Sequence, residues 1–150
     1  MKNTPSLFFR ILYEALQWTW GLLQNLTALI LWAFLRLRYG QMKSISFHGA
    51  RMIFWPLRGS MALGQFIFFG HSGCRDEEEI RVHEYGHTVQ SAFLGPLYLP
   101  LIGLPSLLWA SLPYFERRRK SRKLSYTDIY CESWASRWGE KVLKEPAAWT

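Results

Sequence analysis

The sequence HEYGH, residues 83–87, contains the residue types and spacing of a zinc-binding helix of the form H-E-x-x-H. Side chains four residues apart lie on one face of a helix, so His83 and His87 can each offer an imidazole nitrogen to one ion. Glu84 adjoins the first histidine and can take a proton from a water activated by the metal. The chemistry expected of this segment is metal-assisted attack of water on a carbonyl group.

A catalytic zinc ion usually has three protein ligands, so a further residue must complete the set. Glu132 is the preferred candidate, because a carboxylate buried in so aromatic a segment needs a cation, and because small residues follow it at the next turn. The alternative for Glu132 is an exposed carboxylate that pairs with a nearby basic side chain. The other candidate ligands are His48, His71, Asp128 and Cys131.

Several polar side chains are candidates for supporting the ligands or for stabilising an oxyanion. Asp128 precedes Glu132 by one helical turn and is expected to accept a hydrogen bond from a ligand histidine. Cys74 is a candidate for an extra zinc ligand in a latent state. The candidate oxyanion donors are His48, His71, Tyr126 and Tyr130.

A charge-free stretch at residues 15–35 has the roughly 20 residues that a helix needs to cross a bilayer. Its tryptophans lie toward the two ends, where amphipathic rings favour the membrane interface. Gln24 and Asn25 interrupt the stretch and indicate a face that packs against protein. We therefore predict a transmembrane anchor in residues 1–43; the alternative is a buried amphipathic helix of a soluble domain.

Residues 44–150 are expected to form an α+β, metallopeptidase-like domain. β-rich runs at residues 45–48, 51–55 and 62–69 predict a small antiparallel sheet of two or three strands. The third run is the predicted substrate-binding strand, because an extended peptide can add to a free strand edge. Its central residues are Leu63, Gly64, Gln65 and Phe66.

Two helices are expected to carry the metal ligands. The first begins at the acidic run 76–79, which suits the positive end of a helix dipole, and continues through HEYGH to Gly95 and Pro96. The second covers about residues 126–143 and contains Glu132. The two ligand groups are separated by the apolar segment 95–115.

The segment 95–115 is apolar but holds four prolines, at positions 96, 100, 105 and 113. A straight transmembrane helix seldom carries so many, because each removes a backbone donor that lipid cannot replace. We predict a hairpin that enters the membrane and returns, turning near residues 103–105. The alternative is a full crossing, which would place the site inside the bilayer, as in intramembrane site-2-type proteases.

The formal charge of +7 is carried by clusters of Arg and Lys that flank the apolar stretches, at residues 36–43 and 117–123. This arrangement is typical of chains beside anionic lipid and predicts a site on the cytoplasmic side of the membrane. Nucleic acid is not an expected partner, because its binding would need basic residues interleaved with polar ones. The two cysteines are too few for a disulfide framework.

HEYGH followed by a glutamate in a later helix resembles the gluzincin-type zinc metallopeptidases, in which two histidines and a glutamate hold the metal. The longer segment HEYGHTVQSAFLGPLYLPLIGLPSLL resembles a group of small, largely uncharacterised bacterial membrane proteins. The resemblance covers roughly residues 60–139. Its most specific part runs from HEYGH to the sequence GLPS.

The resemblance implies zinc as the cofactor, with His83, His87 and Glu132 as ligands and Glu84 as the base, in a protein of the bacterial inner membrane. Ser136 stands where the resembling proteins have an aspartate, and it can still hydrogen-bond a ligand histidine. The expected function is that of a membrane-attached zinc metalloendopeptidase acting on peptides or membrane proteins. The alternatives are a non-catalytic zinc-binding membrane scaffold or partner subunit, and a soluble basic domain.

Overall fold

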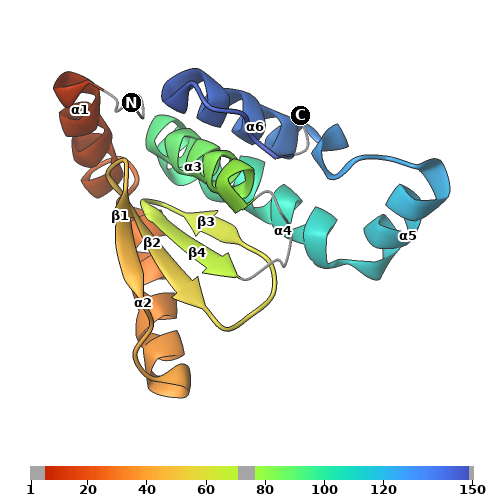
Figure 1. Cartoon of the computed structure of the whole chain (residues 1–150), viewed down its shortest axis with the longest axis horizontal. Coiled ribbons are helices and arrows are strands. Elements are labelled where there is room, and N and C mark those ends of the chain that lie inside the picture. Colours follow the sequence, from red (N-terminus) through yellow and green to blue (C-terminus); the bar gives the residue numbers. More distant parts are fainter. Residues whose placement is uncertain (1–5, 71–76, 149–150) are drawn as a thin grey trace.

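A computed structural model describes residues 6–70 and 77–148, which form six α-helices and a four-stranded sheet (Figure 1). The expected α+β class is confirmed. The helices are α1 (Leu7–Trp18), α2 (Leu22–Tyr39), α3 (Glu77–Leu94), α4 (Leu104–Ser111), α5 (Pro113–Arg122) and α6 (Tyr130–Leu143). The strands are β1 (Ser44–Phe47), β2 (Ala50–Trp55), β3 (Met61–Leu63) and β4 (Phe66–Gly70). Three short helical turns are η1 (Gly95–Leu97), η2 (Leu99–Gly103) and η3 (Tyr126–Asp128).

The sheet has the strand order β1-β2-β4-β3 and is mixed, so the prediction of an antiparallel sheet is wrong. β2 and β4 are parallel, whereas the outer pairs β1/β2 and β3/β4 are antiparallel. The cause is a tight turn at Gly64, whose φ of 61° suits the first position of a two-residue hairpin loop. This turn divides the run 62–69 into two strands, and β4 then lies beside β2.

The sheet is covered on both faces. Alternate residues of β4 point to opposite faces, and all five of its residues are buried. Ile67 and Phe69 pack in the core cluster that includes residues of α3 and α6. Phe66 and Phe68 belong to a second cluster, with residues of α2 and η2. As a result, α3 lies against one face of the sheet and α6 lies beside α3 (Figure 1).

The charge-free stretch 15–35 is not one helix. α1 ends at Trp18, α2 begins at Leu22, and their axes differ by 78°. Within the described residues no single helix has the length and apolar content to cross a membrane, although the bent pair meets both criteria when its halves are taken together. The prediction of one straight helix over residues 15–35 is therefore wrong, and membrane attachment stays a prediction.

Buried amide side chains explain the bend between α1 and α2. The Gln17 amide donates to the Thr88 carbonyl at 2.8 Å, and the Asn25 amide donates to the Gln17 carbonyl at 2.8 Å. The Asn25 side-chain oxygen accepts from the backbone N–H of Gln65 at 2.7 Å. Buried polar groups need such partners, so the chain bends to bring these amides onto α3 and the β3–β4 turn. The division after residue 43 stays a prediction, but residues 7–39 pack on the rest of the chain.

The proline-rich segment continues as a helix from Leu99 to Ser111, so the predicted turn at residues 103–105 is wrong. The chain changes direction instead at Gly95, where φ is 54°, and at Leu112, which is extended. Pro96 and Pro113 follow the changes of direction at Gly95 and Leu112, so their missing N–H groups leave no helical hydrogen bond unmade. Pro100 and Pro105 lie within the continuing helix, at the starts of the π-helical turn η2 and of α4.

Two glycines allow the backbones of α3 and α6 to touch. A Cβ atom on Gly86 would lie 1.8 Å from the Ala135 carbonyl oxygen, and one on Gly139 would lie 2.1 Å from the Val82 carbonyl oxygen. No side chain fits at either position without moving a helix. The expectation that Gly86 and Ala135 allow close approach is confirmed.

We predict that Gly139→Ala lowers the free energy of unfolding by about 1–3 kcal/mol, because the added methyl group must separate two backbones. Chemical denaturation in detergent measures the change. Gly103→Ala is the control, since its Cβ would meet no atom closer than 3.6 Å and its backbone is helical. Equal stability of the two variants would contradict the close helix contact.

Candidate metal centre

α3 and α6 bring three ligand-type side chains to one point. His83 and His87 lie one turn apart on α3, and Glu132 lies in the first turn of α6. All three are buried, with 1%, 5% and 1% of their surface exposed. One ligand atom of each lies within 4.8 Å of the other two. These residues, which the sequence predicted as a set, can hold a metal ion.

The Glu132 carboxylate lies between the two imidazole rings. Its Oε2 is 3.0 Å from Nε2 of His83 and 3.4 Å from Nε2 of His87. Burial alone would raise the pKa of Glu132, but the two rings lower it below its usual range. The carboxylate is therefore an ionised group in a buried place, which requires a positive partner.

The proton on His83 is fixed by a relay to the backbone. Ser136 Oγ donates to the Ala148 carbonyl at 3.3 Å and lies 2.9 Å from Nδ1 of His83. A hydroxyl has a single proton, so Ser136 accepts from the Nδ1–H of His83. Burial lowers the pKa of His83, which favours the neutral ring. In that tautomer the Nε2 lone pair faces Glu132.

His87 is held in the same way by Gln90. The Gln90 amide nitrogen donates to the Cys131 carbonyl at 3.2 Å, which fixes the orientation of the amide. Its oxygen lies 2.8 Å from Nδ1 of His87 and can only accept, so Nδ1 carries a proton. Both rings thus direct Nε2 at Glu132. Burial would lower the pKa of His87, but the Glu132 carboxylate raises it. A divalent cation would take the place of the His87 proton and be held by the two nitrogens and the carboxylate.

Glu84 places a second carboxyl group beside His87 and Glu132. Its side chain is 5% exposed, and its Oε2 has no hydrogen-bond partner within the part of the chain that the structure describes. Burial raises the pKa of Glu84 to about 7, although His87 opposes this shift. A carboxyl group with a pKa near neutrality can both accept and return a proton.

A cavity of about 870 Å³ adjoins the cluster. Glu84, His87 and Glu132 contribute to its wall, so a molecule in the cavity can reach the metal-binding atoms. The rest of the wall is largely apolar and comes from β3, η2, α4 and the ends of neighbouring strands. Among these residues are Trp55, Met61, Leu63, Leu99, Leu104 and Leu107.

Asp128 does not support a ligand histidine. α6 begins at Tyr130 and not at residue 126, so Asp128 precedes the helix and does not share the face of Glu132. Its carboxylate accepts from the backbone N–H of Ser125 at 2.6 Å and caps an exposed turn. Nδ1 of each ligand histidine is bonded to another residue, Ser136 or Gln90.

The other candidates occupy different places. Tyr130 is 45% exposed and donates to the Leu101 carbonyl, and it does not line the cavity. His48 lies in the β1–β2 turn, where its ring contacts Phe47 and Tyr85. Tyr126 lines the cavity. Cys131 is a buried free thiol whose Sγ is 3.9 Å from Oε1 of Glu132. His71 and Cys74 lie outside the described residues.

The predicted substrate strand of residues 63–66 is wrong in its boundaries. Gly64 and Gln65 form the turn between β3 and β4, and Phe66 is buried in the core under α2. Only Leu63 of the four lines the cavity. The strand beside the cavity is β3 (Met61–Leu63), which is an edge of the sheet.

Gln90 and Tyr98 are site residues that sequence reasoning missed. Gln90 follows His87 by three positions, so helical spacing alone would have placed it on the same face. The Tyr98 hydroxyl donates to the Ala62 carbonyl on β3 at 3.1 Å, and its ring lines the cavity. Its place depends on the reversal at Gly95, where the sequence predicted the end of the helix but not the direction of the chain that follows.

The chain was compared with models of known protein families, with curated proteins and with solved structures, and nothing matched.

We predict that Ser136→Ala and Gln90→Ala each weaken zinc binding by about 10- to 100-fold, because each frees a ligand ring to turn or to change its tautomer. Competition with a chromophoric chelator measures the affinity. Ser136→Asp should bind zinc nearly as well as the unchanged chain, since a carboxylate also accepts from Nδ1.

Ser133→Ala is the matched control for the serine, because Ser133 lies on the same helix and its exposed hydroxyl donates to the Tyr130 carbonyl of its own turn. If Ser133→Ala and Ser136→Ala changed zinc affinity equally, the relay through Ser136 would have no part in holding the metal.

Proposed function

We propose that the chain is a membrane-attached zinc metallopeptidase in which His83, His87 and Glu132 hold the ion and Glu84 is the general base. One observation carries the proposal: both rings direct Nε2 at a buried carboxylate, beside a second carboxyl group with an unpaired oxygen. The two histidines and Glu132 match the donor set of zinc hydrolases.

Glu84 favours hydrolysis over other reactions of such a donor set. Two histidines and one carboxylate also hold iron in non-haem oxygenases. Hydrolysis, however, needs a group that accepts the proton of the attacking water, and Glu84 lines the same cavity as His87 and Glu132. A buried carboxyl oxygen that has no hydrogen-bond partner among the described residues, such as Oε2 of Glu84, has no structural role that would explain its cost.

In the proposed mechanism His83, His87 and Glu132 would hold a zinc ion, which would supply a Lewis acid for the substrate carbonyl and for the attacking water. Glu84 accepts the proton of that water on its unpaired Oε2 and later delivers it to the leaving amine. Ser136 and Gln90 keep the two rings in the tautomers that leave Nε2 free. The apolar cavity wall keeps bulk water away from these groups.

We propose that the substrate is a peptide in extended form. β3 is an edge strand that lines the cavity, and edge strands can pair with an added chain. Tyr98 donates to the Ala62 carbonyl of β3, so a peptide that pairs there would take the place of the Tyr98 hydroxyl. The apolar wall around Met61, Leu63 and Leu99 fits large apolar side chains close to the cleaved bond. The flanking Arg and Lys clusters support a location on the cytoplasmic side of a bacterial inner membrane.

A zinc-binding scaffold is the other candidate from the sequence, and it would require a closed four-ligand site. Among the described residues, the cluster contains no fourth His, Cys, Asp or Glu. The cavity reaches two of the three ligands, which leaves a side on which water and a substrate can approach. Both features favour catalysis.

We predict that Glu84→Gln keeps zinc bound but reduces peptide hydrolysis by about 10²- to 10⁴-fold, because the amide cannot accept the proton of water. Zinc content by mass spectrometry and cleavage of internally quenched peptides measure the two effects. Glu116→Gln, at an exposed carboxylate paired with Lys120, is the control and should retain activity. Undiminished hydrolysis by Glu84→Gln would refute the proposed base.

We also predict that the purified protein holds about one zinc ion per chain, and that Glu132→Ala loses most of it, because the three ligands act as a set. Elemental analysis after exchange into metal-free buffer measures the content. Chelation should abolish hydrolysis, and zinc should restore it. A protein purified with iron, and active only with iron, would exclude the zinc mechanism.

A further inference from the structure

Several large leucine side chains are exposed on η1, η2 and α4, the segment that forms one side of the cavity. Leu97, Leu101, Leu104 and Leu107 are 55%, 47%, 52% and 56% exposed. Leu108, on the same helix, is also exposed. Monomeric soluble proteins rarely leave contiguous apolar patches of this kind without a partner. We call this set of five leucines, on η1, η2 and α4, the leucine surface.

The leucine surface adjoins further exposed apolar side chains. η1 packs beside α2, and α2 exposes Leu26, Ile30 and Phe34. Exposed aromatic rings accompany them on the neighbouring helices and in the α1–α2 turn, and such amphipathic rings favour the interface between lipid and water. These rings are Trp18, Trp20, Tyr114, Tyr130 and Trp134.

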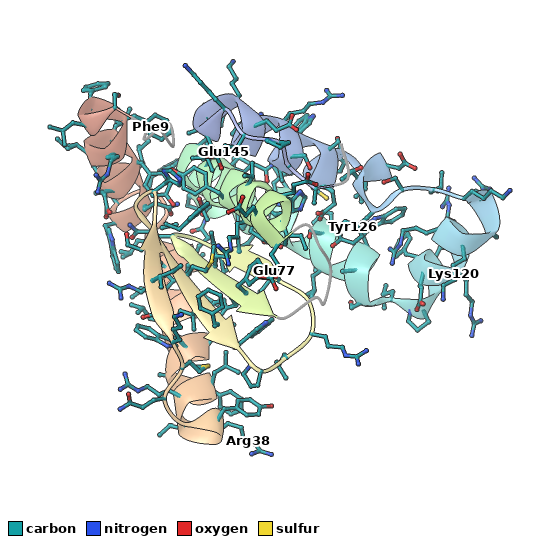
Figure 2. All side chains as sticks on the ribbon, in the orientation of Figure 1. Phe9, Arg38, Glu77, Lys120, Tyr126 and Glu145 are labelled. Atoms are coloured by element: carbon teal, nitrogen blue, oxygen red, sulfur yellow. The ribbon has the colours of Figure 1, made fainter. Side chains whose placement is uncertain are left out.

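Basic side chains flank this apolar surface and indicate what covers it. α5 follows α4 directly and exposes Arg117, Arg118, Lys120 and Arg122. The last turn of α2 carries a second exposed basic pair, which includes Arg38. Arg38 and Lys120 lie at two outlying ends of the molecule (Figure 2). Apolar side chains bordered by positive charge fit an anionic phospholipid bilayer, whose headgroups attract Arg and Lys.

The bend between α1 and α2 favours a protein that lies in one leaflet over one that crosses the bilayer. The two helices differ in direction by 78°, so the pair does not form one straight span of the hydrocarbon layer. A helix with apolar residues on its outer side can lie in the interface plane instead.

The cavity meets this surface at α4. Leu104 and Leu107 line the cavity, and each has more than half of its surface exposed. These two side chains therefore form part of the cavity rim and part of the leucine surface at once. A peptide arriving from water would have to pass apolar side chains, whereas a chain already in lipid would meet a matching surface.

We propose that the leucine surface is immersed in an anionic bilayer and that substrate enters the cavity from the lipid, past Leu104 and Leu107. The substrate class is then a peptide anchored in the membrane by an apolar segment, cleaved where it leaves the lipid. This inference rests on the proposed peptidase function and deepens it.

Membrane docking is tested with vesicles of zwitterionic lipid, with or without an anionic phospholipid. The purified chain should float with the vesicles, and more strongly when anionic lipid is present. Leu101→Glu combined with Leu108→Glu should lower the bound fraction by about tenfold, because two charges would enter the apolar layer. Lys141→Glu is the control, since it makes the same change in net charge at an exposed position on α6. Equal loss for both variants would refute docking through the leucine surface.

Lipid-side entry is tested with one internally quenched apolar peptide in two forms, free in water and attached to a membrane anchor in the same vesicles. The anchored form should be cleaved at least about tenfold faster, because anchoring raises its concentration at the rim. Leu104→Glu combined with Leu107→Glu should remove this preference.

The outcomes separate the two proposals. If neither peptide is cleaved by the zinc-loaded chain, the peptidase function itself fails. If both forms are cleaved at equal rates, or if the preference for the anchored form survives Leu104→Glu with Leu107→Glu, the peptidase function stands and lipid-side entry is refuted. Binding to vesicles without anionic lipid at undiminished strength would refute the role of the basic flanks.

Discussion

The backbone contact between α3 and α6 is the constraint on which the rest of the site depends. Gly86 precedes His87 by one residue, and Ala135 follows Glu132 by three residues, so their contact fixes the glutamate relative to the histidines. A Cβ atom at Gly86 would overlap the Ala135 carbonyl, which means that no larger residue allows this distance. Because the helices touch, water is excluded from between them, and the ligands are buried and strongly coupled in charge.

The two side chains that hydrogen-bond the histidines are themselves hydrogen-bonded to backbone carbonyl groups. Ser136 accepts from His83 and donates to the Ala148 carbonyl. Gln90 accepts from His87 and donates to the Cys131 carbonyl. A carbonyl group does not titrate, so it accepts the proton of Ser136 or Gln90 at every pH. Each of these side chains therefore presents an acceptor to its histidine. A serine can therefore serve where an aspartate would bring a further negative charge next to Glu132.

Sequence reasoning succeeded where helical spacing alone decides the geometry. His83, His87 and Gly86 share helix faces by their spacing, and Glu132 with its small neighbours marks the face that approaches them. It failed where tertiary contacts override an apolar run, as at the Gly64 turn and at the break after Trp18. Buried amides cause that break, and the identity of their partners on α3 is not contained in the local pattern.

Those amides also connect the apolar exterior with the metal ligands. Gln17 bonds to the Thr88 carbonyl, one residue after His87, and Asn25 holds the turn that begins where β3 ends. α1 and α2, which carry exposed apolar side chains, are thus hydrogen-bonded to α3 and to the β3–β4 hairpin. Buried hydrogen bonds of this kind resist relative movement, because each broken one leaves an unpaired polar group. These hydrogen bonds therefore fix α1 and α2 relative to α3 and to the β3–β4 hairpin, and so relative to the cavity that α3 and β3 line.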